Sequence, residues 1–112
     1  MNRVKDLLKS GKTVVGTAGS VFEDNMSMLA NSGLDFILFD TQHSPVEVKQ
    51  YNRAMQATSG AQASPLVRVS ANSADLICFA LDIGARGIVV PMVNTKEEAE
   101  AMVRACKYSP EG

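Results

Sequence analysis

The chain has 112 residues, of which 46% are hydrophobic and 21% charged, with a formal net charge of −1 at pH 7. This composition is typical of a single folded unit, residues 1–112, and it excludes a disordered or fibrous chain. The near-neutral charge with scattered basic residues argues against nucleic-acid binding, and apolar runs too short to cross a bilayer favour a cytoplasmic protein.

The first part of the chain alternates predicted helices and strands. Apolar residues at helical spacing predict a helix over residues 3–9, and a strand is predicted over residues 13–17. The next helix stops at Gly33, and "DFILFD" (residues 35–40) predicts the second strand. Its unbroken apolar run predicts burial on both faces, as in a parallel sheet.

The same alternation continues to the end of the sequence. Ser44 followed by Pro45 is a typical helix start, "PLVRV" predicts a strand over residues 65–69, and Ser73 caps the next helix. A fourth strand is predicted in "RGIVVPMV", and "TKEE" opens a last helix with a capping box. The side chains expected to face the core from the last three helices are Val48, Tyr51, Met55, Thr58, Leu76, Ile77, Ala80, Leu81, Ala99, Met102, Val103 and Cys106.

The two cysteines, Cys78 and Cys106, lie too far apart in the sequence for a metal knuckle or a Cys-x-x-Cys redox motif. Both fall within the apolar stripes of predicted helices. We therefore predict two buried free thiols.

Four strand–helix repeats indicate an α/β fold with a parallel sheet. The predicted strand starts recur at a mean spacing of roughly 25 residues, so eight repeats would need about 200 residues, which suits a (β/α)8 TIM barrel. This chain would then cover about four βα units, a half-barrel. A small doubly wound sheet is the alternative, although it normally has five or six strands.

Polar side chains follow the second predicted strand, at the edge where functional groups gather in both architectures. Asp40 ends the strand, and His43, the sole histidine, lies three residues later. A carboxylate can hold an imidazole in one tautomer and produce a general acid or base. The alternative is that Asp40 accepts hydrogen bonds from loop amides while His43 is structural. A third alternative is a receiver-like signalling domain in which Asp40 would accept a phosphoryl group. It is disfavoured because such a domain needs an acidic pair after the first strand to bind Mg²⁺, and "TVVGTAGS" has none.

Arg68 stands near the end of the third predicted strand, where a cation needs an anionic partner. That carboxylate could belong to the protein or to a ligand, and the sequence leaves both open. The segment "GTAGS" is interpreted as a turn, since it lacks the lysine of a phosphate loop. Pro91 and Met92 are interpreted as packing residues at the rim.

These segments together resemble a family, the pyruvate-class aldolases. It includes 4-hydroxy-2-oxoheptanedioate aldolase and 2-dehydro-3-deoxyglucarate aldolase and is grouped with the citrate lyase β chain. The resemblance runs from "LKSGKTVVGT" through "GLDFILFDTQHSP" and "PLVRV" to "LDIGARGIVVPMVNTKEEAEAMVRACKYSPEG". It implies a (β/α)8 barrel, of which this chain is the N-terminal half, and reversible cleavage of a 4-hydroxy-2-oxo acid to pyruvate and an aldehyde by a homo-oligomer.

The resemblance also implies residue roles. His43 would be the catalytic acid or base, Asp40 its orienting partner, and Arg68 the cation beside the pyruvate oxygens. Gln42, which stands where many relatives carry glutamate, would lie at the substrate. The divalent metal, Mg²⁺ or Mn²⁺, would take its glutamate and aspartate from later strands. No metal ligand is therefore expected within this chain, and the acids of "TKEEAE" are interpreted as capping and solvated charges.

The missing metal ligands raise an alternative, a non-catalytic half-barrel that associates with itself or with another chain. The ending "YSPEG" resembles the middle of a family loop, which favours a fragment of a longer protein. A half-barrel would expose two strand edges, and such edges promote association.

Overall fold

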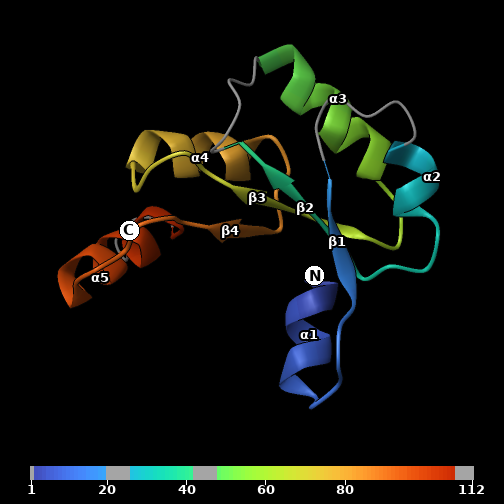
Figure 1. The fold of residues 1–112 in the computed structure, drawn as a ribbon, viewed down its shortest axis with the longest axis horizontal. Helices are drawn as coiled ribbons and strands as arrows, with labels where there is room; N and C mark the ends of the chain where they lie inside the picture. The colour runs from blue at the N-terminus through green and yellow to red at the C-terminus, as the bar shows by residue number, and fades with distance from the viewer. Residues whose placement is uncertain (1, 20–25, 42–47, 108–112) are drawn as a thin grey trace.

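The computed structural model describes residues 2–19, 26–41 and 48–107, which form a layer of helices over one parallel sheet (Figure 1). None of the helices in these ranges has the length and apolarity that crossing a membrane demands. The elements in chain order are α1 (Arg3–Lys9), β1 (Gly16–Gly19), α2 (Met26–Ala30), β2 (Phe36–Asp40), α3 (Val48–Thr58), β3 (Ser64–Arg68), α4 (Ala74–Asp82), β4 (Gly87–Val89) and α5 (Lys96–Ala105). The predicted order of strands and helices is confirmed.

The sheet has the strand order β1-β2-β3-β4, and each neighbouring pair is parallel. In a doubly wound sheet the order reverses beside the first strand, and helices cover both faces. Here the order never reverses, so each crossover advances the sheet in one direction, as in a (β/α)8 barrel. Strand order thus decides between the two predicted architectures in favour of the barrel.

The two faces of the sheet are buried to different extents. Ile37, Phe39 and Val67 are fully buried in a cluster with residues of α2, α3 and α4. Phe36 and Leu38, which alternate with them along β2, point to the opposite face and are half-buried. The predicted complete burial of both faces of β2 is therefore wrong for the described residues, since the helices cover only one face.

The helices confirm some of the predicted inward positions but not all. Tyr51, Met55, Thr58, Ile77 and Ala80 are buried as predicted. The corrections concern Leu76, which is 38% exposed, and α5, which has no buried residue. Helix α5 lies at the end of the sheet against α4, so only part of its apolar stripe finds a neighbour (Figure 1).

The prediction of two buried thiols is also wrong, because both Cys78 and Cys106 are exposed. On α4 the preceding residue, Ile77, is buried, and a helical step of about 100° turns the next side chain away from the sheet. Cys106 is the C-cap of α5, one position beyond its last helical residue.

The first and fourth strands differ from their predicted limits. β1 starts at Gly16, so "GTAG" forms the strand and not the predicted turn. A Cβ at Gly16 would lie 2.4 Å from the Phe36 ring, and glycine allows this close approach. β4 ends at Val89, because Pro91 has no N–H and Met92 has a positive φ of 59°.

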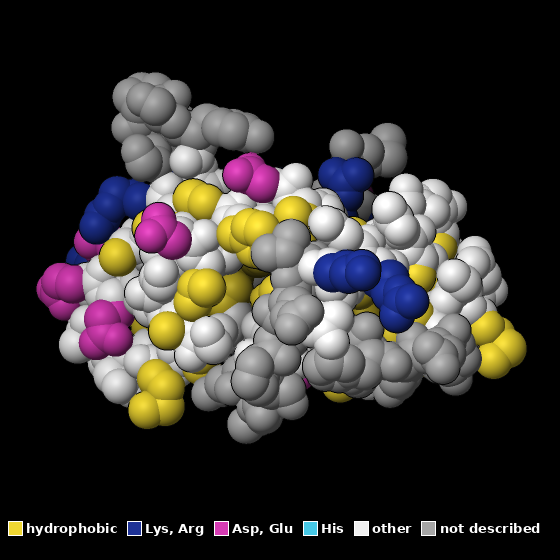
Figure 2. Space-filling view, turned by 90° about the horizontal axis from the view of Figure 1, so that it is seen from above, with side chains coloured by type: hydrophobic (Ala, Val, Ile, Leu, Met, Phe, Trp, Pro, Cys, Tyr) yellow, Lys and Arg dark blue, Asp and Glu magenta, His cyan; other side chains and the backbone are white. Residues whose placement is uncertain are grey.

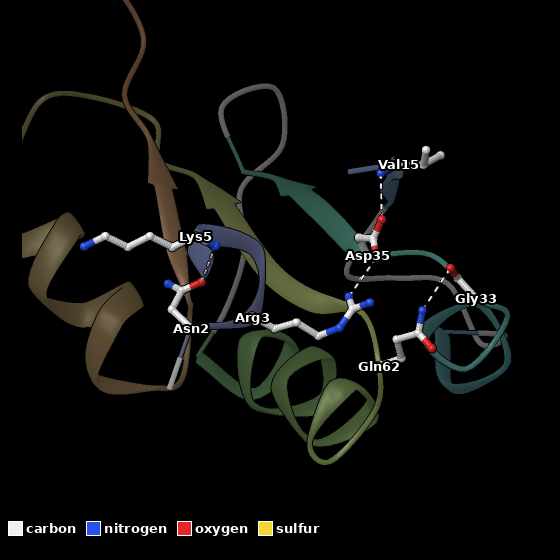
Figure 3. A network of polar contacts seen from close by, with 7 residues as sticks. All are labelled: Asn2, Arg3, Lys5, Val15, Gly33, Asp35 and Gln62. Atoms are coloured by element: carbon white, nitrogen blue, oxygen red, sulfur yellow. Dashed lines mark hydrogen bonds and ion pairs between the residues drawn. The ribbon is translucent and has the colours of Figure 1, made fainter. Parts of the chain in front are cut away.

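Polar contacts fasten α1 beneath the amino ends of the strands (Figure 3). Asp35, the residue before β2, accepts a hydrogen bond from the Val15 amide at 2.9 Å and forms a 2.7 Å ion pair with Arg3. Asn2 Nδ2 donates to the carbonyl of Arg86, just before β4, at 2.8 Å. Because α1 occupies this end, functional groups are expected at the opposite, carboxyl end of the sheet.

The Asp35 contacts predict an acid-sensitive stability. The hydrogen bond from Val15 and the Arg3 guanidinium lower the pKa of Asp35. Their contribution is present above the unfolded pKa of about 3.9 and is lost as pH falls through the lower folded pKa. Below about pH 4, the free energy of unfolding should therefore fall more steeply for the parent than for Asp35→Asn, as measured by urea unfolding across pH.

A matched control is Asp82→Asn, which changes an exposed carboxylate at the end of α4. This variant should retain the parent's steep loss of stability in acid. Equal acid slopes for the parent and Asp35→Asn would contradict the stabilising role assigned to Asp35.

Candidate functional site

The carboxyl edge of the sheet holds an ion pair formed by two of the predicted site residues. Asp40 is the last residue of β2, Arg68 is the last residue of β3, and the two are register partners. Arg68 Nη2 donates to Asp40 Oδ2, and the two side chains are 31% and 26% exposed, respectively. The sequence left open whether the carboxylate beside Arg68 belongs to the protein or to a ligand. In the structure, a carboxylate of the protein, Asp40, pairs with Arg68.

The strand pleat determines where this pair projects. Asp40 alternates with Ile37 and Phe39, so its side chain lies on the face that the helices leave uncovered. Arg68 stands in the same relation to the buried Val67. Both charges therefore keep some contact with water, which avoids the high cost of burying them under the helices.

The pair also shifts the pKa of the arginine. The hydrogen bond to the Asp40 carboxylate raises the pKa of the Arg68 guanidinium further above its already high usual value. Because a guanidinium is charged at any physiological pH, Arg68 is a permanent cation with a planar set of donors, suited to a carboxylate or an enolate oxygen.

Thr41 is a positioning residue that the sequence reasoning missed. It is only 8% exposed. Its Oγ1 donates to the Arg68 carbonyl at 2.7 Å, and its amide donates to the same oxygen at 3.0 Å. These two bonds join the end of β2 to the end of β3 and hold the backbones of Asp40 and Arg68 in register. A small hydroxyl residue directly after a strand-end acid was the available signal.

The edge continues to β4, where Val89 is the register partner of Arg68. The chain then turns away at Met92, which has a positive φ and is 78% exposed. The prediction that Met92 is a packing residue at the rim is therefore wrong. A non-glycine residue at positive φ is uncommon and marks a forced change of direction.

Three predicted features of the site fall outside the described residues. These are Gln42, His43 and the Ser44-Pro45 helix start. The orientation of His43 by Asp40 and the contact of Gln42 with substrate remain predictions.

The described residues do not fit a divalent metal site. Within residues 2–19, 26–41 and 48–107, no three His, Cys, Asp or Glu side chains come together as a ligand set. Asp40 is paired with Arg68, and Glu98 takes part in the capping box, its amide donating to Thr95 Oγ1 at 3.1 Å. Figure 2 shows acidic side chains at the end of the molecule that carries α4 and α5 in Figure 1, where they lie apart from one another on the surface.

Comparison with known sequences finds one family and several similar proteins. The model of the HpcH/HpaI aldolase/citrate lyase family matches residues 19–112. The hydroxypyruvate/pyruvate aldolase of Roseobacter denitrificans is 39% identical, over 100% of this chain and 44% of the relative. The 4-hydroxy-2-oxo-heptane-1,7-dioate aldolase of Klebsiella pneumoniae is 38% identical, over 99% of this chain and 42% of the relative. The chain thus spans less than half the length of these curated relatives.

Solved structures match with the same coverage. An HpcH/HpaI aldolase from Desulfitobacterium hafniense superposes with a TM-score of 0.88 at 32% identity, over 100% of this chain and 44% of that one. The citrate synthase SbnG superposes with a TM-score of 0.85 at 32% identity, over 100% of this chain and 46% of that one. The four βα units are therefore similar to less than half of each solved chain.

Proposed function

Because the chain belongs to the HpcH/HpaI aldolase/citrate lyase family, we propose that the protein acts as a carbon–carbon lyase. The reaction is the reversible cleavage of a 4-hydroxy-2-oxo acid to pyruvate and an aldehyde. We further propose that it depends on a divalent metal and takes place in the cytoplasm, in a homo-oligomer. The observation that carries the proposal is the Arg68 cation, held by Asp40 at the carboxyl edge of a barrel-type sheet.

Arg68 is proposed to bind the 2-oxo acid end of the substrate. Its guanidinium stays charged, and it projects from the uncovered face of the sheet, where a ligand can reach it. A carboxylate can accept two parallel hydrogen bonds from such a group. The same positive charge would stabilise the negative charge that develops on the 2-oxo oxygen as the carbon–carbon bond breaks.

His43 is proposed to remove the proton from the 4-hydroxyl group. The bond between C3 and C4 then breaks, C4 becomes the aldehyde carbon, and C3 takes up a proton to form pyruvate. Asp40 would orient the imidazole while still accepting from Arg68, since a carboxylate has about four acceptor positions. Gln42, next to His43 in sequence, would contact the substrate.

The metal ligands are proposed to lie outside the described residues, because these do not form a ligand set. Mg²⁺ and Mn²⁺ are the expected ions, since oxygen ligands such as carboxylates suit both. The aldehyde partner would likewise be selected by residues elsewhere in the protein.

The test is a cleavage assay on the product of the complete reading frame. Incubation with 4-hydroxy-2-oxoheptanedioate should release pyruvate, detected with lactate dehydrogenase and NADH. EDTA treatment should lower the rate by at least about 100-fold if the metal supplies several kcal/mol, and Mg²⁺ or Mn²⁺ should restore it. Full activity after EDTA would contradict the metal dependence, and no pyruvate from any 4-hydroxy-2-oxo acid would contradict the lyase.

A second candidate is a non-catalytic half-barrel that pairs with itself or another chain. It is favoured by the uncovered face of the sheet, where Phe36, Leu38 and Leu66 remain half-buried. A dimer in analytical ultracentrifugation together with no metal-dependent pyruvate release would support this candidate over the lyase.

A further inference from the structure

The two cysteines lie side by side on the outer layer of the molecule. Cys78 is on α4, Cys106 is the C-cap of α5, and both are exposed. They line one cavity of about 290 Å³ between the two helices, together with Leu81, Asp82, Ala105 and Lys107. The fold thus brings together two thiols that are far apart in the sequence.

The distance between the two thiols follows from one contact. The Cys78 thiol donates to the carbonyl oxygen of Ala105 at 3.5 Å. This oxygen and the Cα of Cys106 belong to the same peptide plane and are about 2.8 Å apart. The Cys78 sulfur therefore lies within about 6 Å of the Cys106 Cα, a separation that side-chain rotation and a small shift of the helix end can close.

The same proximity affects the pKa of the Cys106 thiol. Partial burial raises its pKa, and the neighbouring Cys78 raises it further, because two thiolates repel each other.

We propose that Cys78 and Cys106 form a reversible redox pair that closes to a disulfide between α4 and α5. The oxidant is a low-molecular-weight disulfide such as glutathione disulfide. One cysteine thiolate attacks it, which forms a mixed disulfide and releases one glutathione thiolate. The second cysteine attacks the protein sulfur of the mixed disulfide and releases the other glutathione. Two protein thiols are oxidised, glutathione disulfide is reduced, and the two protons pass to the glutathione thiolates.

The test compares folded and unfolded protein in glutathione redox buffers. After quenching with acid and alkylation, trypsin should release residues 69–86 joined to residues 105–107, since cleavage follows Arg68, Arg86, Arg104 and Lys107. The midpoint of disulfide formation is the ratio of oxidised glutathione to the square of reduced glutathione, [GSSG]/[GSH]², at which half of the protein is oxidised. In the folded protein this midpoint should be at least about tenfold lower than in guanidinium chloride, because the fold raises the effective concentration of one thiol at the other.

Two single variants serve as controls. Cys78→Ser and Cys106→Ser should each give only the mixed disulfide with glutathione, with a circular dichroism spectrum like that of the parent. The proposal is overturned if the folded parent forms only mixed disulfides, or if its midpoint equals that of the unfolded protein. Either result would mean that the sulfurs cannot meet in the fold.

Discussion

Replacing Arg68 with alanine is expected to lower kcat/KM for cleavage of a 4-hydroxy-2-oxo acid by about 10²–10³-fold, as the loss of one preorganised donor at a developing oxyanion does. The variant loses the permanent cation and also leaves the Asp40 carboxylate beside the site. That carboxylate would repel the anionic substrate, so KM should rise and kcat should fall. The effect is measured as the rate of pyruvate release by the complete protein. This prediction rests on the proposed function.

Three variants make this experiment specific. Arg53→Ala removes an exposed arginine from α3 and should leave kcat/KM unchanged. Arg68→Lys keeps the charge but loses the planar pair of donors, so its activity should lie between those of the parent and Arg68→Ala. His43→Ala should lower kcat if His43 moves the hydroxyl proton. Parent-like turnover by Arg68→Ala, with an intact fold by circular dichroism, would show that the assigned role is wrong.

Replacing Ile77 with alanine is expected to destabilise the protein by about 2–5 kcal/mol. Ile77 is fully buried in the cluster formed by the helices and the covered face of the sheet. The substitution removes apolar contacts and leaves a cavity that rigid neighbours only partly fill. Urea unfolding should show a lower midpoint with an unchanged m-value.

The adjacent residue is the matched control for this prediction. Leu76 is 38% exposed on the same helix, so Leu76→Ala should cost no more than about 1 kcal/mol. The comparison tests the orientation of α4 directly, because the sequence pattern had placed both residues toward the core. Equal losses in the two variants would mean that α4 is rotated relative to the structure described.

Much of the fold followed from local signals in the sequence. The limits of α1 were predicted to the residue, and Ser73 and Thr95 cap their helices as predicted. These features depend on neighbours three or four positions away, which a linear pattern records. Exposure of Leu76 and Cys78 could not be predicted in this way, because an apolar stripe does not reveal how much of a helix finds a partner.

The sequence by itself determined the alternation of strands and helices and placed Asp40 and Arg68 at strand ends, since apolar runs and caps are local properties. Only the tertiary structure decided that these two residues face each other, because the register between β2 and β3 is set by packing across the whole sheet. The same holds for Thr41 and for the two cysteines, whose contacts join residues distant in the sequence. Such contacts exist only once the chain has folded.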